Sequence, residues 1–229
     1  MTANNEIGTI QDIARLADIA HAHGAMFHTD AVQAVCRIPI DVKALDGDML
    51  SASAHKFNGP RGIGFLYIRK GIKVRPFMDG GGQENKNRAG TENTAAIVGM
   101  SIALMNNIQN MRNTSDSIRA LENLLITKLL EAGLVFKRNG VNTLPGLISL
   151  SFPHSSGEML LHRMDLKGIC ISTGSACDGS NDEISHVLQA IHLPDEYAKG
   201  TVRISLGKQN TESDIIKIAE SLKQILTPK

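Results

Sequence analysis

Apolar residues near the start of the chain recur with the spacing of an amphipathic helix. Over residues 11–23 they return every three or four positions, and Gly24 follows where a left-handed C-cap is expected. Short apolar runs then occupy residues 25–28, 48–53 and 62–68. Their length and the polar residues between them predict three strands. A helix followed by strands with short connections is typical of an α/β layer.

The second half of the chain alternates helical patterns with short apolar runs. We expect long helices at residues 94–110 and 115–132, and a domain boundary where they join. Beyond the join the pattern predicts strands at residues 134–137, 147–152, 168–172 and 202–206, and helices at residues 156–166 and 183–191. A closing helix begins at Thr211, with Asp214 three residues on as a near capping box. This half therefore predicts a small α+β unit.

The composition excludes several classes of protein. Hydrophobic residues make up 42% of the 229 residues, enough for a sizeable core. Because 24 Lys and Arg residues balance 23 Asp and Glu residues, the net charge of +1 offers no long-range attraction for nucleic acid or acidic membranes. No apolar run approaches a membrane span, and the first residues do not resemble a signal peptide. With only three cysteines, we expect a cytoplasmic protein that binds neither nucleic acid nor membrane.

The stretch from Ser51 to Gly64 contains the end of an apolar run, then a histidine, a lysine and a glycine-rich turn. Its candidate chemical group is Lys56. A lysine at the end of a buried strand loses hydration, which lowers its pKa and frees an amine that can attack a carbonyl. The alternative is a solvated surface lysine before a turn, which is the commoner state of an isolated lysine.

Polar residues around Lys56 match what pyridoxal phosphate (PLP) requires. The pyridine nitrogen of PLP needs a carboxylate partner, which Asp30 can supply just past a predicted strand. Gln33 can reach the phenolic oxygen, and Ser53 and His55 can donate hydrogen bonds to the phosphate. Each residue alone has an ordinary structural explanation, such as a helix cap for the aspartate. Together they predict a PLP site.

Two residues in the second half of the chain are candidates for binding or reacting with a substrate. Cys177 lies among Gly, Ser and Asn residues, where a buried structural thiol would not be expected, so we expect an exposed nucleophile on a mobile loop. The alternative is a loop cysteine without a role. Arg203 interrupts an apolar strand, and its planar fork suits a substrate carboxylate, unless it is an edge-strand arginine facing solvent. Cys36 and Cys170 lie in apolar surroundings and are expected in the core.

The spacing of the histidines and cysteines predicts no metal site. His21 and His23 are two residues apart on the expected helix and so do not share a face, while His28 lies in a strand. Cys170 and Cys177 lack the short spacing of zinc or thioredoxin motifs.

Seven short motifs follow one another along the chain in an order that resembles the cysteine desulfurases. They are Asn4-Asn-Glu-Ile-Gly8, His28-Thr-Asp-Ala-Val-Gln33, Ser53-Ala-His-Lys56, Gly80-Gly-Gly-Gln83, Arg88-Ala-Gly-Thr91, Ser172-Thr-Gly-Ser-Ala-Cys177 and Arg203-Ile-Ser-Leu-Gly207. Cysteine desulfurases belong to the class V aminotransferase family of fold-type I PLP enzymes. The resemblance implies an α/β fold with part of a large, mostly parallel-sheet PLP domain over residues 1–105. It also implies a small α+β domain over residues 106–229.

The resemblance also implies a role for each candidate residue. It gives Lys56 as the covalent anchor of PLP, Asp30 at the pyridine nitrogen, Gln33 at the phenolic oxygen, Ser53 and His55 at the phosphate, Asn5 beside substrate and cofactor, Arg203 at the substrate carboxylate, and Thr91 at the phosphate of a neighbouring subunit. A homodimer follows from the role of Thr91.

The reaction implied by the resemblance is the removal of sulfur from L-cysteine. The Cys177 thiolate attacks the substrate sulfur, alanine leaves, and a persulfide stays on Cys177. The sulfur then passes to an acceptor protein, either an iron–sulfur scaffold or a tRNA-thiolation protein. Two other functions remain open at this point. One is a non-catalytic fragment that binds a partner chain or sulfur acceptor, and the other is a related PLP lyase or aminotransferase that uses no cysteine nucleophile.

The chain departs from the family pattern in two respects. Family members carry roughly half a large domain more before the position of Met1, a size in keeping with usual domain lengths. That part holds the histidine that stacks on PLP, a phosphate-binding threonine and several strands. Because residues 1–8 read like a strand end running into a loop, we expect Met1 to correspond to an internal methionine of a longer ancestral chain. Cys36 stands where relatives usually have glycine, and we expect it to serve packing.

Overall fold

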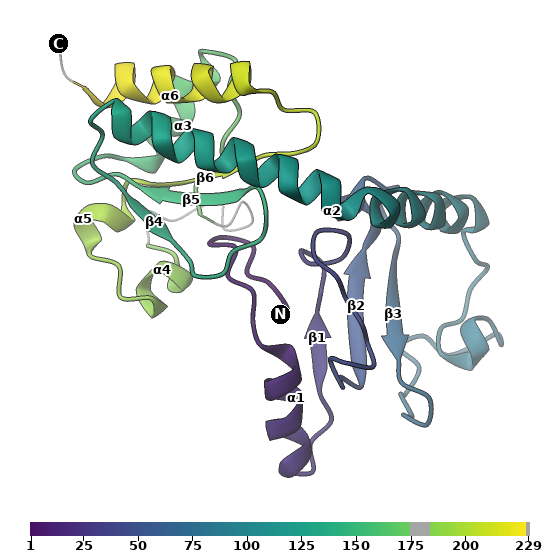
Figure 1. Ribbon diagram of the computed structural model, residues 1–229. Coiled ribbons are helices and arrows are strands. Elements are labelled where there is room, and N and C mark those ends of the chain that lie inside the picture. The colour runs from purple at the N-terminus through teal and green to yellow at the C-terminus, as the bar shows by residue number, and fades with distance from the viewer. Residues whose placement is uncertain (175–183, 228–229) are drawn as a thin grey trace. The chain divides into compact units, whose positions relative to one another are not determined.

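The chain packs as two compact units in a computed structural model that describes residues 1–174 and 184–227 (Figure 1). The first unit comprises Met1–Thr2 and Gln11–Met111, and the second comprises Ala3–Ile10 and Arg112–Lys229. Compactness does not define folding domains, so the domain boundary expected between residues 105 and 106 stays a prediction.

The first unit begins with the amphipathic helix expected from the sequence. Helix α1 (Ile13–Ala22) is capped by Asp12, whose side chain accepts a hydrogen bond from the backbone of Arg15. Its C-terminal end closes at Gly24, which has a φ of 69°, followed by a hydrogen bond from Ala25 N–H to the carbonyl of Ala20. The strand expected at residues 25–28 therefore starts later, because the helix cap uses its first residues.

Three strands form the sheet of the first unit, in the order β1 (His28–Asp30), β2 (Met49–Ser53) and β3 (Gly64–Ile68). Strands β1 and β2 run parallel, whereas β2 and β3 are antiparallel. The register places Thr29, Leu50 and Tyr67 on one face, and the first two of these are buried. Asp30 and Ser51 lie on the opposite face beside Leu66, which is 49% exposed. Among the described residues, this second face is the less buried one.

A single long helix, α2 (Thr94–Glu131), replaces the two helices expected at residues 94–110 and 115–132. The prediction of a break was wrong because residues 111–114 contain neither glycine nor proline, so nothing in the backbone stops the helix. Residues 94–111 belong to the first unit and the remainder to the second. None of the helices in the described parts of the chain has the length and apolarity that a membrane crossing needs.

The second unit is an antiparallel sheet packed with helices. Its strands lie in the order β4 (Lys137–Asn139), β5 (Leu147–Ser151) and β6 (Thr201–Ser205). Its further helices are α3 (Gly157–Asp165), α4 (His186–Ala190), α5 (Asp195–Ala198) and α6 (Glu212–Leu226). The core contains fully buried leucines and isoleucines from α2, β5, α3 and α6, among them Leu129, Ile148, Leu160 and Leu222.

Two local predictions for this unit have opposite outcomes. The capping box of α6 is confirmed, since the side chains of Thr211 and Asp214 each accept a hydrogen bond from the backbone of the other. The strand expected at residues 168–172 does not form, and only Ser172 makes an isolated bridge, to Arg203. The first residues of the expected strand instead close the end of helix α3, because Ile169 N–H donates to the carbonyl of Met164.

A buried glutamate holds α2 to the sheet of the second unit. Glu122 is 1% exposed, and its carboxylate contacts the guanidinium groups of Arg119 and Arg138. Its other oxygen accepts a hydrogen bond from the backbone N–H of Gly146 at 3.0 Å, just before β5. Arg119 and Arg138 also reach Thr143. Two positive charges and a backbone donor thus neutralise a charge that burial alone would make costly.

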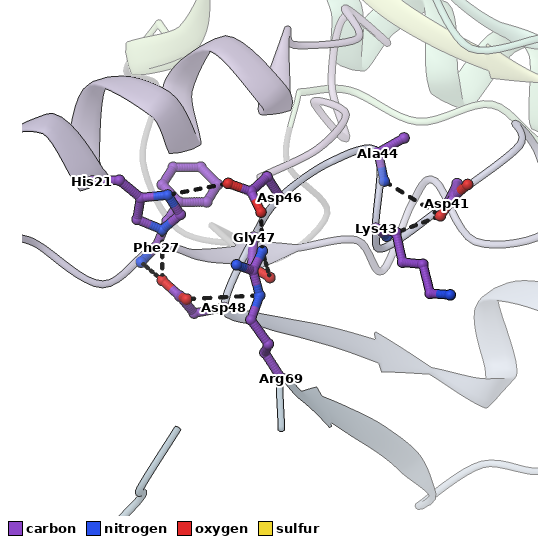
Figure 2. Close-up of polar contacts among 9 residues, drawn as sticks. All are labelled: His21, Phe27, Asp41, Lys43, Ala44, Asp46, Gly47, Asp48 and Arg69. Carbon is purple, nitrogen blue, oxygen red and sulfur yellow. Dashed lines mark hydrogen bonds and ion pairs between the residues drawn. The ribbon is translucent and has the colours of Figure 1, made fainter. Parts of the chain in front are cut away.

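A second buried carboxylate organises the first unit (Figure 2). Asp48 is 5% exposed, and its Oδ2 accepts hydrogen bonds from the backbone N–H of Phe27 at 2.7 Å and from His21 at 2.9 Å. Arg69, at the end of β3, pairs with Asp46 at 2.6 Å and approaches Asp48 at 4.0 Å. The hydrogen bond from Phe27, followed by that from His21, holds the pKa of Asp48 below its ordinary value.

We expect the Asp48→Asn variant to be less stable at neutral pH by about 2 kcal/mol, the usual worth of a hydrogen bond to a charged group. Because the folded pKa lies below the unfolded value of about 3.9, the contribution is complete at neutral pH and is lost as the pH falls through the folded pKa. Urea unfolding of both proteins at pH 7 and near the folded pKa measures this difference.

The matched control is Asp18→Asn, which neutralises an exposed carboxylate on α1. A stability difference for Asp48→Asn that stays constant from neutral to acidic pH would show that the charge of Asp48 does not contribute.

Candidate active site

The candidate site of the first unit lies at the carboxyl edge of the parallel strands. Asp30 is the last residue of β1 and Ser53 the last residue of β2, and the register pairs Asp30 with Ser51. Since parallel strands end at the same edge, their following residues emerge together. The chain then passes from Ser53 directly into the short 3₁₀ turn η1 (Ala54–Phe57), which carries His55 and Lys56. The structure therefore brings Asp30, Ser53, His55 and Lys56 to one edge of the sheet, while their expected roles stay predictions.

Asp30 has one carboxylate oxygen fixed and one available. Its Oδ1 accepts a hydrogen bond from the backbone N–H of Val32 at 2.8 Å. Among the residues that the structure describes, none donates to Oδ2. Asp30 is half-buried, so this oxygen can accept a hydrogen bond from a ring N–H. Gln33, also half-buried, follows in a turn that is stabilised by the hydrogen bond from Val35 N–H to the carbonyl of Ala31.

The 3₁₀ turn η1 determines which way the next side chains face. Ala54 and Phe57 are buried, so His55 and Lys56 between them are exposed. The burial expected for Lys56 is therefore wrong for the described residues, although its expected chemical role stays a prediction. Ser53 Oγ and His55 Nδ1 are 2.8 Å apart and form a hydrogen bond. Whichever of the two atoms donates in this hydrogen bond, one O–H or N–H of the pair remains to donate to an anion at the strand end.

Close packing behind η1 requires glycine. A Cβ atom on Gly59 would lie 2.9 Å from Ala54 Cβ, and one on Gly64 would lie 2.3 Å from the carbonyl oxygen of Ala52. Gly59 N–H donates to the carbonyl of Ala54 at 2.8 Å, which closes the turn after Asn58. Gly59 and Gly64 therefore allow the backbone to pack closely around Lys56.

Asn107 on α2 supports η1 and was not among the residues singled out from the sequence. Its Nδ2 donates to the carbonyl of Phe57 at 2.8 Å and to that of Ala103 at 2.7 Å. The only indication in the sequence is an asparagine inside an apolar helical segment, where its helix propensity is unfavourable.

The second unit brings Arg203 and Asn5 into contact. Arg203 Nη1 donates to the carbonyl oxygen of Asn5 at 2.9 Å. Asn5 lies in a tight turn in which Asn4 Oδ1 accepts hydrogen bonds from the N–H groups of Glu6 and Ile7. The backbone of Arg203 pairs with Ser149 of β5 on one side and with Ser172 on the other. Arg203 is half-buried in β6, an edge strand of the sheet, and its expected role at a substrate carboxylate stays a prediction.

Three further candidates complete this comparison with the sequence. Thr91 is exposed in the loop between the short turn η2 (Glu84–Lys86) and α2, and its expected role at a neighbouring subunit stays a prediction. Cys177 lies outside the described residues. Cys170 is exposed, which corrects its expected place in the core. In residues 1–174 and 184–227 no three His, Cys, Asp or Glu side chains are grouped to hold a metal ion.

Cys36 is a packing residue with an unusual backbone. Its φ of 65° lies in the left-handed region, which explains why a glycine is favoured at this position. Its half-buried thiol donates to the carbonyl of Leu104 at 3.9 Å, and burial raises its pKa to about 11. The raised pKa favours the protonated thiol at neutral pH, which is the less nucleophilic form.

Comparisons with known proteins agree with this geometry. The family model described as Aminotransferase class-V matches residues 1–218. The chain is 46% identical over 228 residues to the cysteine desulfurase IscS of Dictyoglomus turgidum, and 40% identical over 233 residues to the cysteine desulfurase NifS of Azotobacter vinelandii. Each alignment covers 99% of this chain, but only 58% and 57% of the two relatives. The chain thus spans less than three fifths of the length of these relatives.

The fold is also that of solved structures. A NifS-like protein from Rickettsia africae matches with a TM-score of 0.88 and 35% sequence identity, over 98% of this chain and 60% of that one. A cysteine desulfurase from Thermococcus onnurineus, 22% identical, shares the fold at a TM-score of 0.83. The α/β fold of the fold-type I PLP enzymes, expected from the sequence, is confirmed.

We expect Asn107→Leu to loosen η1, because the carbonyl of Phe57 loses its donor from α2. The cost in stability should be about 1 kcal/mol, the usual net worth of a neutral hydrogen bond. Hydrogen exchange of residues 54–60 measures the local effect and should become faster. Asn106→Leu is the matched control, since the Asn106 side chain is exposed. Equal exchange rates in both variants would remove the supporting role from Asn107.

Proposed function

We propose that this chain, which belongs to the class V aminotransferase family, carries the PLP and substrate groups of a cysteine desulfurase. The reaction is the PLP-dependent removal of sulfur from L-cysteine, giving L-alanine and a persulfide on Cys177. The observation that carries this proposal is the parallel pair β1 and β2, which brings Asp30, Ser53 and Lys56 to one edge of a sheet. The similarity to two cysteine desulfurases supports the choice of reaction.

The donor set at this edge fits PLP. Asp30 Oδ2, to which none of the described residues donates, would accept from the pyridine N–H, and the hydroxyl and imidazole of Ser53 and His55 suit the phosphate. Gln33 lies in the turn after β1, within the segment that would face the phenolic oxygen. Lys56 is exposed beside them and would hold the cofactor covalently. When bound, PLP supplies an electron sink for charge at the substrate α-carbon.

Arg203 is placed to bind the α-carboxylate of an amino acid. A guanidinium carries five donors, and the carbonyl of Asn5 occupies only one nitrogen, Nη1. That hydrogen bond fixes the plane of the group and leaves its other donors for a bidentate contact with a carboxylate. Lys56 would move a proton at the substrate α-carbon, which is the second role expected of its amine.

Sulfur transfer would be the task of Cys177. Its thiolate attacks the sulfur of the bound cysteine, a sulfur–sulfur bond forms, and the carbon–sulfur bond breaks. The electron pair of that bond goes to the substrate carbon, which takes up a proton to become the methyl group of alanine. Both sulfur atoms are oxidised by one electron each and the carbon is reduced by two. Cys177 follows Ser172 by five residues, and the backbone of Ser172 pairs with that of Arg203.

The partners in this proposal follow the resemblance. L-cysteine is the substrate, Thr91 would contact the phosphate of a neighbouring subunit in a homodimer, and the persulfide passes to an iron–sulfur scaffold or a tRNA-thiolation protein. A second candidate function is that of a non-catalytic chain that binds a partner chain or a sulfur acceptor.

PLP should bind covalently to Lys56. After incubation with PLP and reduction with borohydride, mass spectrometry should find the PLP adduct on the peptide containing Lys56. The Lys56→Ala variant should lose the adduct, whereas Lys70→Ala, which removes another exposed lysine of the first unit, should keep it. Equal labelling of the wild type and Lys56→Ala would contradict the proposed cofactor site.

Cysteine turnover should depend on the thiol of Cys177. With PLP and L-cysteine the wild type should release sulfide on addition of a reductant, and Cys177→Ala should release none. Cys170→Ala is the matched control, because it removes the exposed cysteine that the structure describes. Full turnover by Cys177→Ser would instead support a PLP lyase or aminotransferase that needs no cysteine nucleophile.

A further inference from the structure

The second unit contains a buried carboxylate, Glu6, that is held differently from Glu122. Glu6 is 4% exposed. Within the described residues its carboxylate accepts a hydrogen bond from the hydroxyl of Ser185, which lies 2.6 Å from Oε2. Glu122 instead contacts two arginines, and a neutral hydroxyl offsets the burial of a charge less than a guanidinium does. A buried acid that adds little to stability is typical of a functional position.

The backbone that carries Glu6 is fixed at both polar atoms of one peptide unit. The carbonyl oxygen of Asn5 accepts a hydrogen bond from Arg203 Nη1 at 2.9 Å. The N–H of the same peptide unit belongs to Glu6 and donates to Asn4 Oδ1 at 2.8 Å. Because a peptide unit is planar, the two hydrogen bonds together fix the direction in which the Glu6 side chain leaves the turn. The turn therefore sets both the Arg203 guanidinium and the Glu6 carboxylate.

Glu6 holds the start of helix α4. Ser185 Oγ donates its hydrogen to Glu6, and it accepts a hydrogen bond from the N–H of Val187 at 3.1 Å as the N-cap of α4. One hydroxyl thus links the carboxylate to the helix backbone. Ile7, next to Glu6, belongs to a small apolar cluster against which Ile184 packs. The turn and the start of α4 are therefore joined by a polar contact and by apolar packing.

The chain also approaches Glu6 just before the segment that contains Cys177. Ser172 N–H donates to the carbonyl of Arg203 at 3.0 Å, and its own carbonyl accepts from Arg203 N–H at 2.7 Å. Two residues later, a Cβ atom placed on Gly174 would lie 4.0 Å from Glu6 Oε2. The same carboxylate oxygen therefore lies beside the chain both before and after the segment with Cys177.

We propose that Glu6 is a positioning residue for sulfur transfer, because its carboxylate ties Gly174 and Ser185 to the turn that orients Arg203. The inference rests on the proposed function, in which Arg203 binds the carboxylate of L-cysteine and the Cys177 thiolate attacks its sulfur. Such an attack needs the two sulfur atoms within about 3–3.5 Å of each other in a fixed direction. The groups that hold the substrate and the nucleophile must therefore be fixed relative to one another, and Glu6 provides that link.

Kinetics with PLP and L-cysteine in D₂O separate sulfur transfer from the steps before it. Exchange of the substrate α-proton reports substrate binding and the action of Lys56, whereas sulfide release also needs Cys177. Glu6→Gln should lower the kcat of sulfide release about tenfold or more, because the reacting groups are misplaced, and should leave α-proton exchange at the wild-type rate. Ser185→Ala should act in the same way. The double variant should be no slower than the slower single variant, because the two residues act as one pair.

Hydrogen exchange of the 229-residue chain without PLP gives a readout that does not depend on activity. In Glu6→Gln, exchange at residues 172–174 and 184–187 should become faster, because a neutral amide holds the Ser185 hydroxyl less strongly than a carboxylate does. Ser156→Ala is the matched control, since Ser156 caps α3 as Ser185 caps α4. This control should speed exchange only near the start of α3 and should release sulfide at the wild-type rate.

Three outcomes would contradict the inference or its premise, and they are distinguishable. Wild-type sulfide release by Glu6→Gln, or unchanged exchange at residues 172–174 and 184–187, would overturn the role of Glu6 alone. Loss of α-proton exchange together with sulfide release in both variants would also overturn it, because Glu6 would then support the fold as a whole. A wild-type chain that releases no sulfide would instead contradict the proposed function itself.

Discussion

A buried carboxylate needs compensation, and each unit of this chain is arranged around one that has it. In the first unit Asp48 draws the end of α1, the segment before β1 and the end of β3 to one point through His21, Phe27 and Arg69. In the second unit Glu122 gathers two arginines and the backbone before β5. An unpaired carboxylate at either position would be costly, so the elements that supply the donors must meet there. The hydrophobic core fills the space that these contacts define.

The Glu122 cluster also supports the turn that contacts Arg203. Arg119 and Arg138 bind Thr143, whose backbone bridges to Thr9. The turn before Thr9 carries the Asn5 carbonyl that fixes the Arg203 side chain. A continuous set of polar contacts therefore joins the buried carboxylate to the candidate carboxylate-binding arginine. In the first unit the site depends on backbone pairing, because the parallel register alone aligns Asp30 with the end of β2.

The sequence was most informative where chemistry and local rules agree. The helix at Ile13–Ala22 and the capping box at Thr211 follow from periodicity and capping. Periodicity does not show whether two helical segments are continuous, so α2 was divided wrongly. Apolar neighbours in the sequence also do not prove that a residue is buried, because Cys170 has such neighbours and is exposed. Contacts between distant segments, such as that of Asn107 with Phe57, have almost no sequence pattern of their own.

The two cysteines that the structure describes, Cys36 and Cys170, differ in how accessible their thiols are to reagents. Cys36, whose thiol pKa is raised to about 11, holds its proton at neutral pH and should react slowly with alkylating agents and oxidants. Cys170 is exposed to solvent. In the proposed sulfur transfer, the exposed thiol of Cys170 would be a second group onto which sulfur can exchange. Replacing Cys170 is thus the first step toward an unambiguous persulfide measurement, whereas Cys36 can be left in place.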